Sequence, residues 1–219
     1  PHPALLHVEP FTPIIEVEME PGDILYIPPG FPHDGYTFEA TLNYSVGFRG
    51  PNGRDLISSF ADYALENDLG EKYYTDPDLT CREHAGKVED HELERLRTMM
   101  IDMIRQPDDF KQWFGSFIST PRHELDLAPA EPPYEPEEVA AALESGETLR
   151  RLNGLRVLNI GGCFFINSER VETCAPQAMD ALSRYTEVNS TLLGEALHNP
   201  AFVVELTALI NQGYWFFDE

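Results

Sequence analysis

The sequence is poor in cysteine and in lysine. Its 219 residues contain three cysteines, Cys81, Cys163 and Cys174. These are too few and too scattered for a disulfide framework, so we expect a reducing compartment and predict a cytoplasmic protein. Only three of the fifteen basic residues are lysine, and the acid-rich surface that results fits either a salty habitat or drift in codon usage.

The sequence also lacks any apolar run of about 18 residues, which excludes a membrane-spanning helix. The formal net charge of −23 and the pI near 4.5 argue against a nucleic acid or an anionic membrane as the main partner. The chain is nevertheless 42% hydrophobic and 11% aromatic, which is typical of a globular protein with a substantial core.

The first 52 residues have a β-like pattern. Apolar and acidic residues alternate over 15–20, which predicts a half-buried strand. A Pro-Gly-Asp turn follows, and then a short apolar strand over 24–27 that ends at Pro28-Pro29-Gly30. A third strand is predicted over 40–48.

Residues 54–121 are predicted to be helical. A stripe from Leu56 to Ala64 indicates a helix that ends at Gly70, a second stripe begins near Asp90, and Pro107 opens a third helix rich in aromatic residues. The many aromatic and methionine side chains on these helices are expected to be buried against another surface. That surface is either a helical dimer interface or the chain's own core.

Residues 124–148 contain eight acids and no lysine or arginine. Their four prolines predict a linker that runs into a helix near 136–145. The remaining residues predict strands over 155–160 and 164–167 and helices over about 176–185 and 200–212. Helices with a small hairpin are compatible with a winged-helix domain, and because no basic recognition helix is present, we interpret it as a protein-contact or structural module.

One stretch indicates chemistry: PGDILYIPPGFPH, residues 21–33. A rigid Pro-Pro-Gly turn presents His33 at the end of an apolar strand, and an imidazole aimed in this way is a good metal ligand. The alternative is a histidine in an ordinary β-turn.

This stretch resembles the second metal-binding motif of JmjC/cupin-type, 2-oxoglutarate-dependent oxygenases. Further strings are similar to one subgroup, the bacterial ribosomal oxygenases, which hydroxylate an arginine of a large-subunit ribosomal protein. These strings are NYSVGFR (43–49), FADY (60–63), FKQWFG (110–115), RHELD (122–126) and GYWFF (213–217). The resemblance covers essentially the whole chain.

The resemblance implies an α+β protein with four parts. They are the C-terminal part of a JmjC/cupin jelly roll (1–53), a helical dimerisation domain (54–123), an acidic proline-rich linker (124–134) and a winged-helix-like domain (135–219). It also implies a homodimer, and a basic ribosomal protein as substrate. The net charge of −23 fits such a partner.

In that family, Fe(II) is held by a His-x-Asp pair and a distal histidine, which leaves coordination sites for 2-oxoglutarate and O₂. The distal ligand corresponds to His33. The His-x-Asp pair and the basic residue that pairs with 2-oxoglutarate are expected upstream of Pro1, so we expect the chain alone to be inactive. Asn43 and Ser45 share a face of the next strand and are predicted to contact 2-oxoglutarate or support the metal site; ordinary strand residues are the alternative.

Two nearby patterns are not counted as metal sites. His7-Val8-Glu9 imitates the missing pair, but only 23 residues separate Glu9 from His33, too few for the strands that lie between ligand groups in a jelly roll. Cys81, His84 and His91 lack a fourth zinc ligand at a suitable spacing.

The sequence therefore predicts the C-terminal portion of a 2-oxoglutarate- and Fe(II)-dependent protein hydroxylase. A non-enzymatic cupin-like binding module and a winged-helix nucleic-acid-binding regulator are the alternatives. An upstream His-x-Asp would favour the enzyme, and salt-dependent DNA binding by residues 135–219 would favour the regulator.

Overall fold

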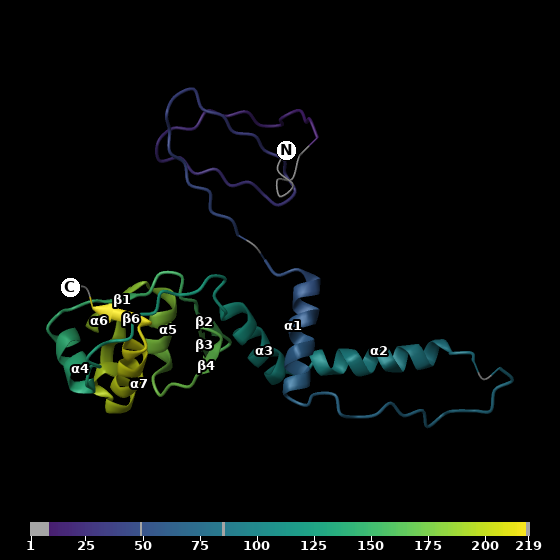
Figure 1. Ribbon diagram of the computed structural model, residues 1–219. Helices are drawn as coiled ribbons and strands as arrows, with labels where there is room; N and C mark the ends of the chain where they lie inside the picture. The colour runs from purple at the N-terminus through teal and green to yellow at the C-terminus, as the bar shows by residue number, and fades with distance from the viewer. Residues whose placement is uncertain (1–8, 49, 85, 218–219) are drawn as a thin grey trace. The chain divides into compact units, whose positions relative to one another are not determined.

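The computed structural model describes residues 9–48, 50–84 and 86–217. The chain divides into two compact units, Pro1–Gly50 and Pro51–Glu219, both drawn in Figure 1. None of the helices in the described part of the chain has the length and hydrophobicity that a membrane crossing requires.

The first unit is an extended chain that reverses at two tight turns, over residues 20–23 and 28–31. In each turn the amide of the fourth residue donates to the carbonyl of the first, over 3.0 and 3.3 Å. Proline stands second and glycine third, and Gly22 and Gly30 have φ of +100° and +83°. Both are therefore type II turns, in which the third residue needs a positive φ.

The strands predicted over 15–20, 24–27 and 40–48 are not formed within residues 9–48, and this part of the prediction is wrong. Alternation shows which face of a segment is apolar, but a strand also needs a hydrogen-bonded partner. These segments are extended without pairing with one another. Apolar side chains such as Ile24 (94% exposed) and Phe38 (90%) accordingly find no cover among the described residues of this unit.

The second unit begins with three helices at the predicted places: α1 (Gly53–Glu66), α2 (Asp90–Ile104) and α3 (Pro107–Ser119). Local sequence explains their starts. The Asn52 side chain accepts from the backbone N–H groups of Arg54 and Asp55, at 2.9 and 3.0 Å, and so caps α1. Pro107 occupies the first position of α3, where its missing N–H costs no hydrogen bond.

The aromatic face of α3 packs inside the chain. Trp113 is 4% exposed, and its indole N–H donates to Ser59 Oγ of α1 over 3.0 Å. Its ring meets Phe60 edge to face and stacks on Phe117, with centroids 5.1 and 5.8 Å apart. The aromatic residues thus join α1 to α3. Of the two expected partners for the aromatic helix surface, a second copy or the chain's own core, the chain's own core buries this part.

Helix α2 is different, because none of its residues is buried. Its apolar stripe, Leu93, Leu96, Met100 and Ile104, is between 44% and 65% exposed. We call these four residues the α2 stripe. The described residues of the chain leave it open to solvent.

The remaining elements form the predicted arrangement of helices around small antiparallel sheets. The predicted helices correspond to α4 (Pro136–Glu144), α5 (Pro176–Arg184) and α7 (Pro200–Asn211), and the predicted hairpin to β2 (Val157–Ile160) and β3 (Cys163–Ile166). The shorter elements were not predicted; they are β1 (Leu149–Arg151), β4 (Glu169–Val171), β5 (Glu187–Val188), α6 (Ser190–Leu193), the 3₁₀ helix η1 (Gly194–His198) and β6 (Trp215–Phe217).

Two three-stranded sheets organise this part, with the orders β5-β1-β6 and β2-β3-β4. The central strand β1 pairs antiparallel with both neighbours, so that Leu149 lies opposite Val188 on one side and Phe217 on the other. One core cluster connects these strands to the helices, and its largest fully buried side chains include Trp215, Phe202 and Met179.

Helix α3 docks on the β2-β3-β4 sheet. Ser119 is fully buried; its hydroxyl donates to the Gly115 carbonyl (2.7 Å) and accepts from the Ser168 amide (3.1 Å) in the β3–β4 turn. Arg156 Nη1 also donates to the Ile118 carbonyl over 2.8 Å, near the end of α3. The helix is thereby fixed to the hairpin by polar contacts as well as by packing.

The acidic proline-rich segment is also attached to this core. The Ala130 amide donates to the Asn211 carbonyl over 3.2 Å. The Asn211 side chain bonds both backbone groups of Tyr134, accepting at 2.8 Å and donating at 3.0 Å. The segment therefore lies against the end of α7, to which these hydrogen bonds attach it.

Candidate functional site

His33 stands two residues after the second type II turn. Its side chain is exposed, and its Nδ1 lies 3.4 Å from the carbonyl oxygen of Phe31, two residues earlier. When the proton is on Nδ1, this nitrogen donates to Phe31 and leaves the Nε2 lone pair available. A histidine oriented in this way by a backbone carbonyl is the usual form of a metal ligand.

Asn43 and Ser45 lie in the same unit, on an extended and exposed segment. Their alternation places both side chains on one face of that segment. Within residues 9–48, no hydrogen bond joins either of them to His33. The predicted contribution of Asn43 and Ser45 to the site therefore stays a prediction. His7, which belongs to the rejected His-x-Glu pattern, lies outside the described residues.

A different set of metal-ligating groups gathers on α2 and the segment before it. One ligand atom each from Asp76, His91 and Glu92 lies within 4.8 Å of the other two. Cys81 and His84, considered with His91 in the sequence, do not join this group among the described residues. Of the three residues considered in the sequence, His91 alone belongs to this group within the described chain.

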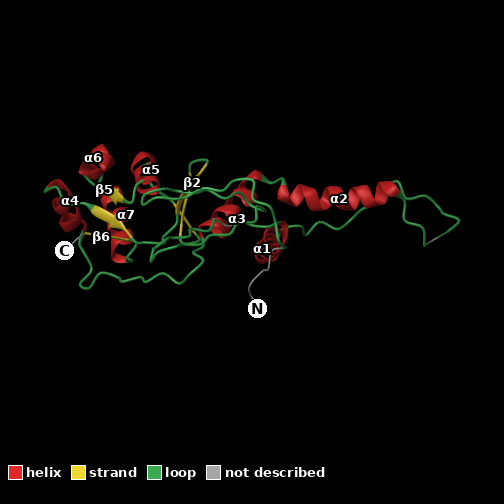
Figure 2. Ribbon diagram, turned by 90° about the horizontal axis from the view of Figure 1, so that it is seen from above, coloured by secondary structure: helices red, strands yellow, loops and turns green. Residues whose placement is uncertain are grey.

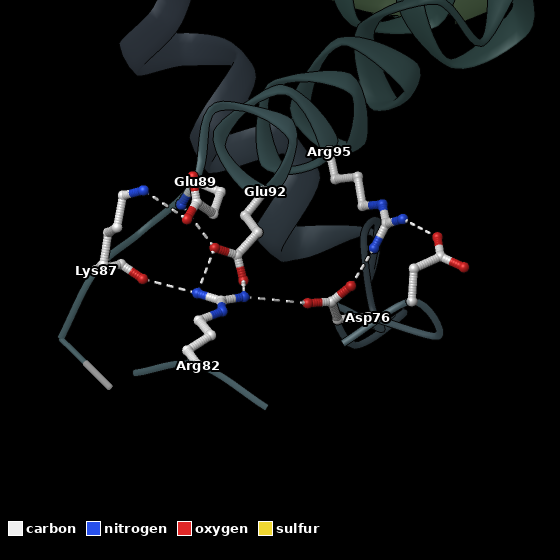
Figure 3. A network of polar contacts seen from close by, with 7 residues as sticks. Asp76, Arg82, Lys87, Glu89, Glu92 and Arg95 are labelled. Carbon is white, nitrogen blue, oxygen red and sulfur yellow. Dashed lines mark hydrogen bonds and ion pairs between the residues drawn. The ribbon is translucent and has the colours of Figure 1, made fainter. Parts of the chain in front are cut away.

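The charges around this group favour ion pairs over a metal ion. Figure 3 shows Arg95 bound to Asp76 and Arg82 bound to Glu92, and Arg82 also lies 3.9 Å from the second Asp76 oxygen. Two guanidinium groups already neutralise the carboxylates, and their positive charge repels a divalent cation. We refer to Asp76, Arg82, Glu92 and Arg95 as the ionic clasp.

The ionic clasp attaches the described residues of the segment before α2, 71–84 and 86–89, to that helix. Arg95 also pairs with Asp78, Arg82 Nη1 donates to the Lys87 carbonyl over 2.7 Å, and Lys87 pairs with Glu89 at 2.8 Å. Figures 1 and 2 show this segment running alongside α2 before the chain turns back into the helix. The clasp thus positions a helix that the hydrophobic core does not hold.

The clasp predicts a local dependence on pH. The pKa of Glu92 is lowered from 4.5 to about 2, first by its hydrogen bonds to Arg82 and next by the Glu89 backbone amide. Since the folded-state pKa is depressed, the carboxylate stabilises the folded segment fully above pH 4.5, and this contribution is lost as the pH falls toward 2. The Glu92→Gln variant should therefore speed amide hydrogen exchange in residues 71–89 severalfold at pH 6, measured by mass spectrometry.

The control for this prediction is Glu94→Gln, which removes an exposed carboxylate on the same helix; among the described residues it pairs only with Arg97. It should leave exchange in residues 71–89 unchanged. Equal exchange in the two variants would show that the clasp does not hold the segment.

Three exposed arginines within residues 135–217 are paired with acids. Arg184 of α5 lies 2.9 Å from Asp180, Arg170 lies 2.8 Å from Glu172, and Arg150 lies 3.1 Å from Glu187. Such pairing leaves little positive charge for a phosphate backbone. It fits the prediction that nucleic acid is not a partner, which remains a prediction.

Comparison with known proteins decides the family. The model of the ROXA-like winged helix matches residues 102–216, more than half of the chain, and the model of the JmjC domain matches residues 1–56. The chain belongs to the JmjC-type ribosomal oxygenases. The region matched by the winged-helix model begins at residue 102, before α3. It therefore includes α3, in agreement with the docking of this helix on the β2-β3 hairpin.

The ribosomal oxygenase relatives include the ribosomal protein uL16 3-hydroxylase of Escherichia coli. It is 55% identical over 218 residues, which is 100% of this chain and 58% of that protein. A probable ribosomal oxygenase of Haemophilus influenzae is 29% identical over 155 residues, 66% of this chain and 38% of the relative. The chain thus spans less than two thirds of the length of either relative.

Solved structures agree with this assignment. The crystal structure of the Escherichia coli ribosomal oxygenase YcfD matches 98% of this chain and 59% of its own, with a TM-score of 0.90 and 55% identity. YcfD in complex with cobalt and 2-oxoglutarate matches 98% of this chain and 60% of its own, with a TM-score of 0.88 and 54% identity. The predicted α+β fold class, with a JmjC part and a winged-helix part, is thereby confirmed.

Proposed function

We propose that the full-length protein to which this chain belongs is a 2-oxoglutarate- and Fe(II)-dependent oxygenase. It would hydroxylate an arginine side chain of a large-subunit ribosomal protein. The observation that carries the proposal is the 55% identity, over 218 residues, to a ribosomal protein 3-hydroxylase. The complex of YcfD with cobalt and 2-oxoglutarate supports an enzyme over a non-enzymatic cupin-like binder.

The residues present fit an iron site in part. His33 has its Nδ1 next to the Phe31 carbonyl, so that Nε2 is free to bind a metal ion. Bound Fe(II) would supply the activation of O₂, with 2-oxoglutarate as cosubstrate. This chain supplies one of the three ligands implied by the family resemblance, and the chain alone is therefore proposed to be inactive.

Asn43 and Ser45 are proposed to contact 2-oxoglutarate. An amide and a hydroxyl both donate to carboxylate oxygens, and the extended segment presents the two groups on one face. Their role would be to orient the cosubstrate beside the metal, so their loss should raise the KM for 2-oxoglutarate more than it lowers the amount of bound iron.

The substrate is proposed to be a basic ribosomal protein. With 38 acidic against 15 basic side chains, the chain attracts a cationic partner over a distance and repels nucleic acid. A ribosomal substrate and three free cysteines support a cytoplasmic location.

The proposal is tested with the full-length protein and a peptide from the large-subunit ribosomal protein. Incubation with Fe(II), 2-oxoglutarate and O₂ should add the mass of one oxygen atom to an arginine of the peptide, as mass spectrometry would detect. Omitting either Fe(II) or 2-oxoglutarate should prevent the addition. A product formed equally well without 2-oxoglutarate would overturn the proposed reaction class.

We further propose that residues 54–123 form a homodimer through the α2 stripe. The stripe is apolar, contiguous and open, and surfaces of this kind in soluble proteins are commonly interfaces. A second copy meets it symmetrically, since both subunits of a twofold dimer use the same patch.

The dimer proposal predicts that Leu96→Glu converts the full-length protein to a monomer, because it places a charge in the centre of the apolar contact. Sedimentation velocity at micromolar concentration measures the result. Thr98→Glu introduces the same charge on another face of α2 and should leave the dimer intact. A Leu96→Glu protein that still sediments as a dimer would exclude the α2 stripe as the interface.

A further inference from the structure

A shallow groove of about 250 Å³ lies between α1 and α3, and Ser168 of the β3–β4 turn lines part of it. Helix α1 contributes one face, with Asp62, Tyr63 and Glu66, and α3 contributes one face, with Trp113 and Phe117. The Trp113–Ser59 hydrogen bond of 3.0 Å fixes the two helices against each other at the groove floor. The groove therefore lies between two helices that are held in place relative to each other.

The α3 wall is aromatic, and its partly exposed ring is that of Phe117, because Trp113 is only 4% exposed. The rings of Trp113 and Phe117 stack at an interplanar angle of 19°, with centroids 5.8 Å apart. Tyr63 lines the groove from α1, and burial, together with the charge of Asp109, raises the pKa of its hydroxyl, so the phenol is neutral near pH 7. Aromatic faces carry a negative electrostatic potential that attracts cations.

The α1 wall is acidic. Asp62 and Glu66 are one helical turn apart and exposed, and among the described residues neither carboxylate forms an ion pair. No lysine or arginine is found among the described residues that line the groove. Two unpaired carboxylates opposite an aromatic wall leave negative charge that is not neutralised within the described chain.

We propose that this groove binds an arginine of a basic protein segment. A guanidinium group is planar and always charged, so it can stack on an aromatic face while its N–H groups donate to carboxylates. The volume is below the range of about 300–1,000 Å³ that is usual for drug-sized ligands, which fits a single side chain. The net charge of −23 favours a cationic partner.

The inference does not depend on the iron site. The groove lies within the unit Pro51–Glu219, whereas His33 belongs to the other unit. Binding to the groove is therefore measurable on the chain itself, without iron, 2-oxoglutarate or catalysis.

The test uses tryptophan fluorescence of the 219-residue chain, with acetylated hexaarginine amide as the probe. The chain has two tryptophans, both of them buried, and since only Trp113 borders the groove, a saturable change in emission reports on Trp113. Asp62→Asn/Glu66→Gln should weaken peptide binding about tenfold at low ionic strength, because both carboxylate partners are lost. Circular dichroism checks that this variant is folded.

The matched control is Glu144→Gln/Glu147→Gln, which changes the net charge equally at two exposed positions of α4 and its C-terminal loop. It should bind within about twofold of the unmodified chain. Equal weakening by both double variants would mean attraction by net charge alone and would overturn the inference.

Two further measurements distinguish arginine from the other possible occupants of the groove, a lysine side chain and a second copy of the chain. Hexalysine should bind severalfold more weakly than hexaarginine, because an ammonium group lacks the planar face that stacks; equal affinity would overturn the assignment to arginine. A change in Trp113 emission with chain concentration alone, without peptide, would show that a second copy fills the groove, and would overturn it as well.

Discussion

Replacing His33 with alanine in the full-length protein will lower its iron-dependent consumption of 2-oxoglutarate by more than about 100-fold. Changes to residues that merely support a metal ligand typically cost about 10- to 100-fold in affinity or activity, and removal of the ligand itself should cost more. Consumption of 2-oxoglutarate measures turnover, and iron content after gel filtration measures binding. Turnover and iron content should both fall in the His33→Ala protein.

The expected loss follows from the geometry of the turn before His33. The Pro28–Phe31 turn has its φ values fixed by Pro29 and Gly30, with Gly30 at +83°. The Phe31 carbonyl then orients the imidazole. Residues 28–32 offer no side-chain ligand in place of a lost Nε2, since they are proline, glycine and phenylalanine.

His84→Ala provides the control. His84 is an exposed histidine of the other unit, and its replacement should leave both turnover and iron content unchanged. If the His33→Ala protein retained its iron and its turnover, His33 would not be a ligand. If it retained iron but lost turnover, His33 would act on the substrate and not on the metal.

The helices were predictable because their signals are local. Asn52 caps α1, Pro107 opens α3, and the apolar stripes have the helical period, so the residues within one element are enough to define it. The position of His33 after a Pro-Pro-Gly turn was predictable for the same reason. Both type II turns follow from proline and glycine at adjacent positions.

What could not be predicted depends on partners far away in the sequence. Alternation over residues 15–20 gave no information on whether a partner strand pairs with it. Strand β1 pairs with β6, more than sixty residues away, and three residues are too few to show a period. The ionic clasp joins Asp76 to Arg95, and charged residues on exposed segments give no pattern that names their partners.

The packing of α3 on the hairpin also went unpredicted, although Gly115 carried a signal. A glycine in the middle of an aromatic helix lowers helix propensity by about 1 kcal/mol relative to alanine, so its presence indicates a close approach. The structure supplies the reason: a Cβ at Gly115 would lie less than 3.0 Å from three ring carbons of Phe165.

Gly115→Ala should therefore destabilise the second unit by about 3 kcal/mol, even though alanine is the better helix former. Phe165 is fully buried in the central strand β3, and its ring cannot move away without disturbing the β2-β3-β4 sheet. Urea unfolding of the 219-residue chain, followed by circular dichroism, measures the loss. Gly53→Ala is the control, because Gly53 opens α1 with nothing within 4 Å of its Cβ position, and its effect should stay within about 1 kcal/mol.

The cause of the loss can be separated from a general helix effect by a second change at Phe165. Phe165→Leu removes part of the ring that the new methyl group meets, so the double variant should be more stable than the sum of the two single losses implies, by about 1 kcal/mol or more. Additive losses would mean that the two side chains do not meet. In that case α3 would not be docked on β3 by packing, and the polar contacts Ser119–Ser168 and Arg156–Ile118 would have to hold the helix.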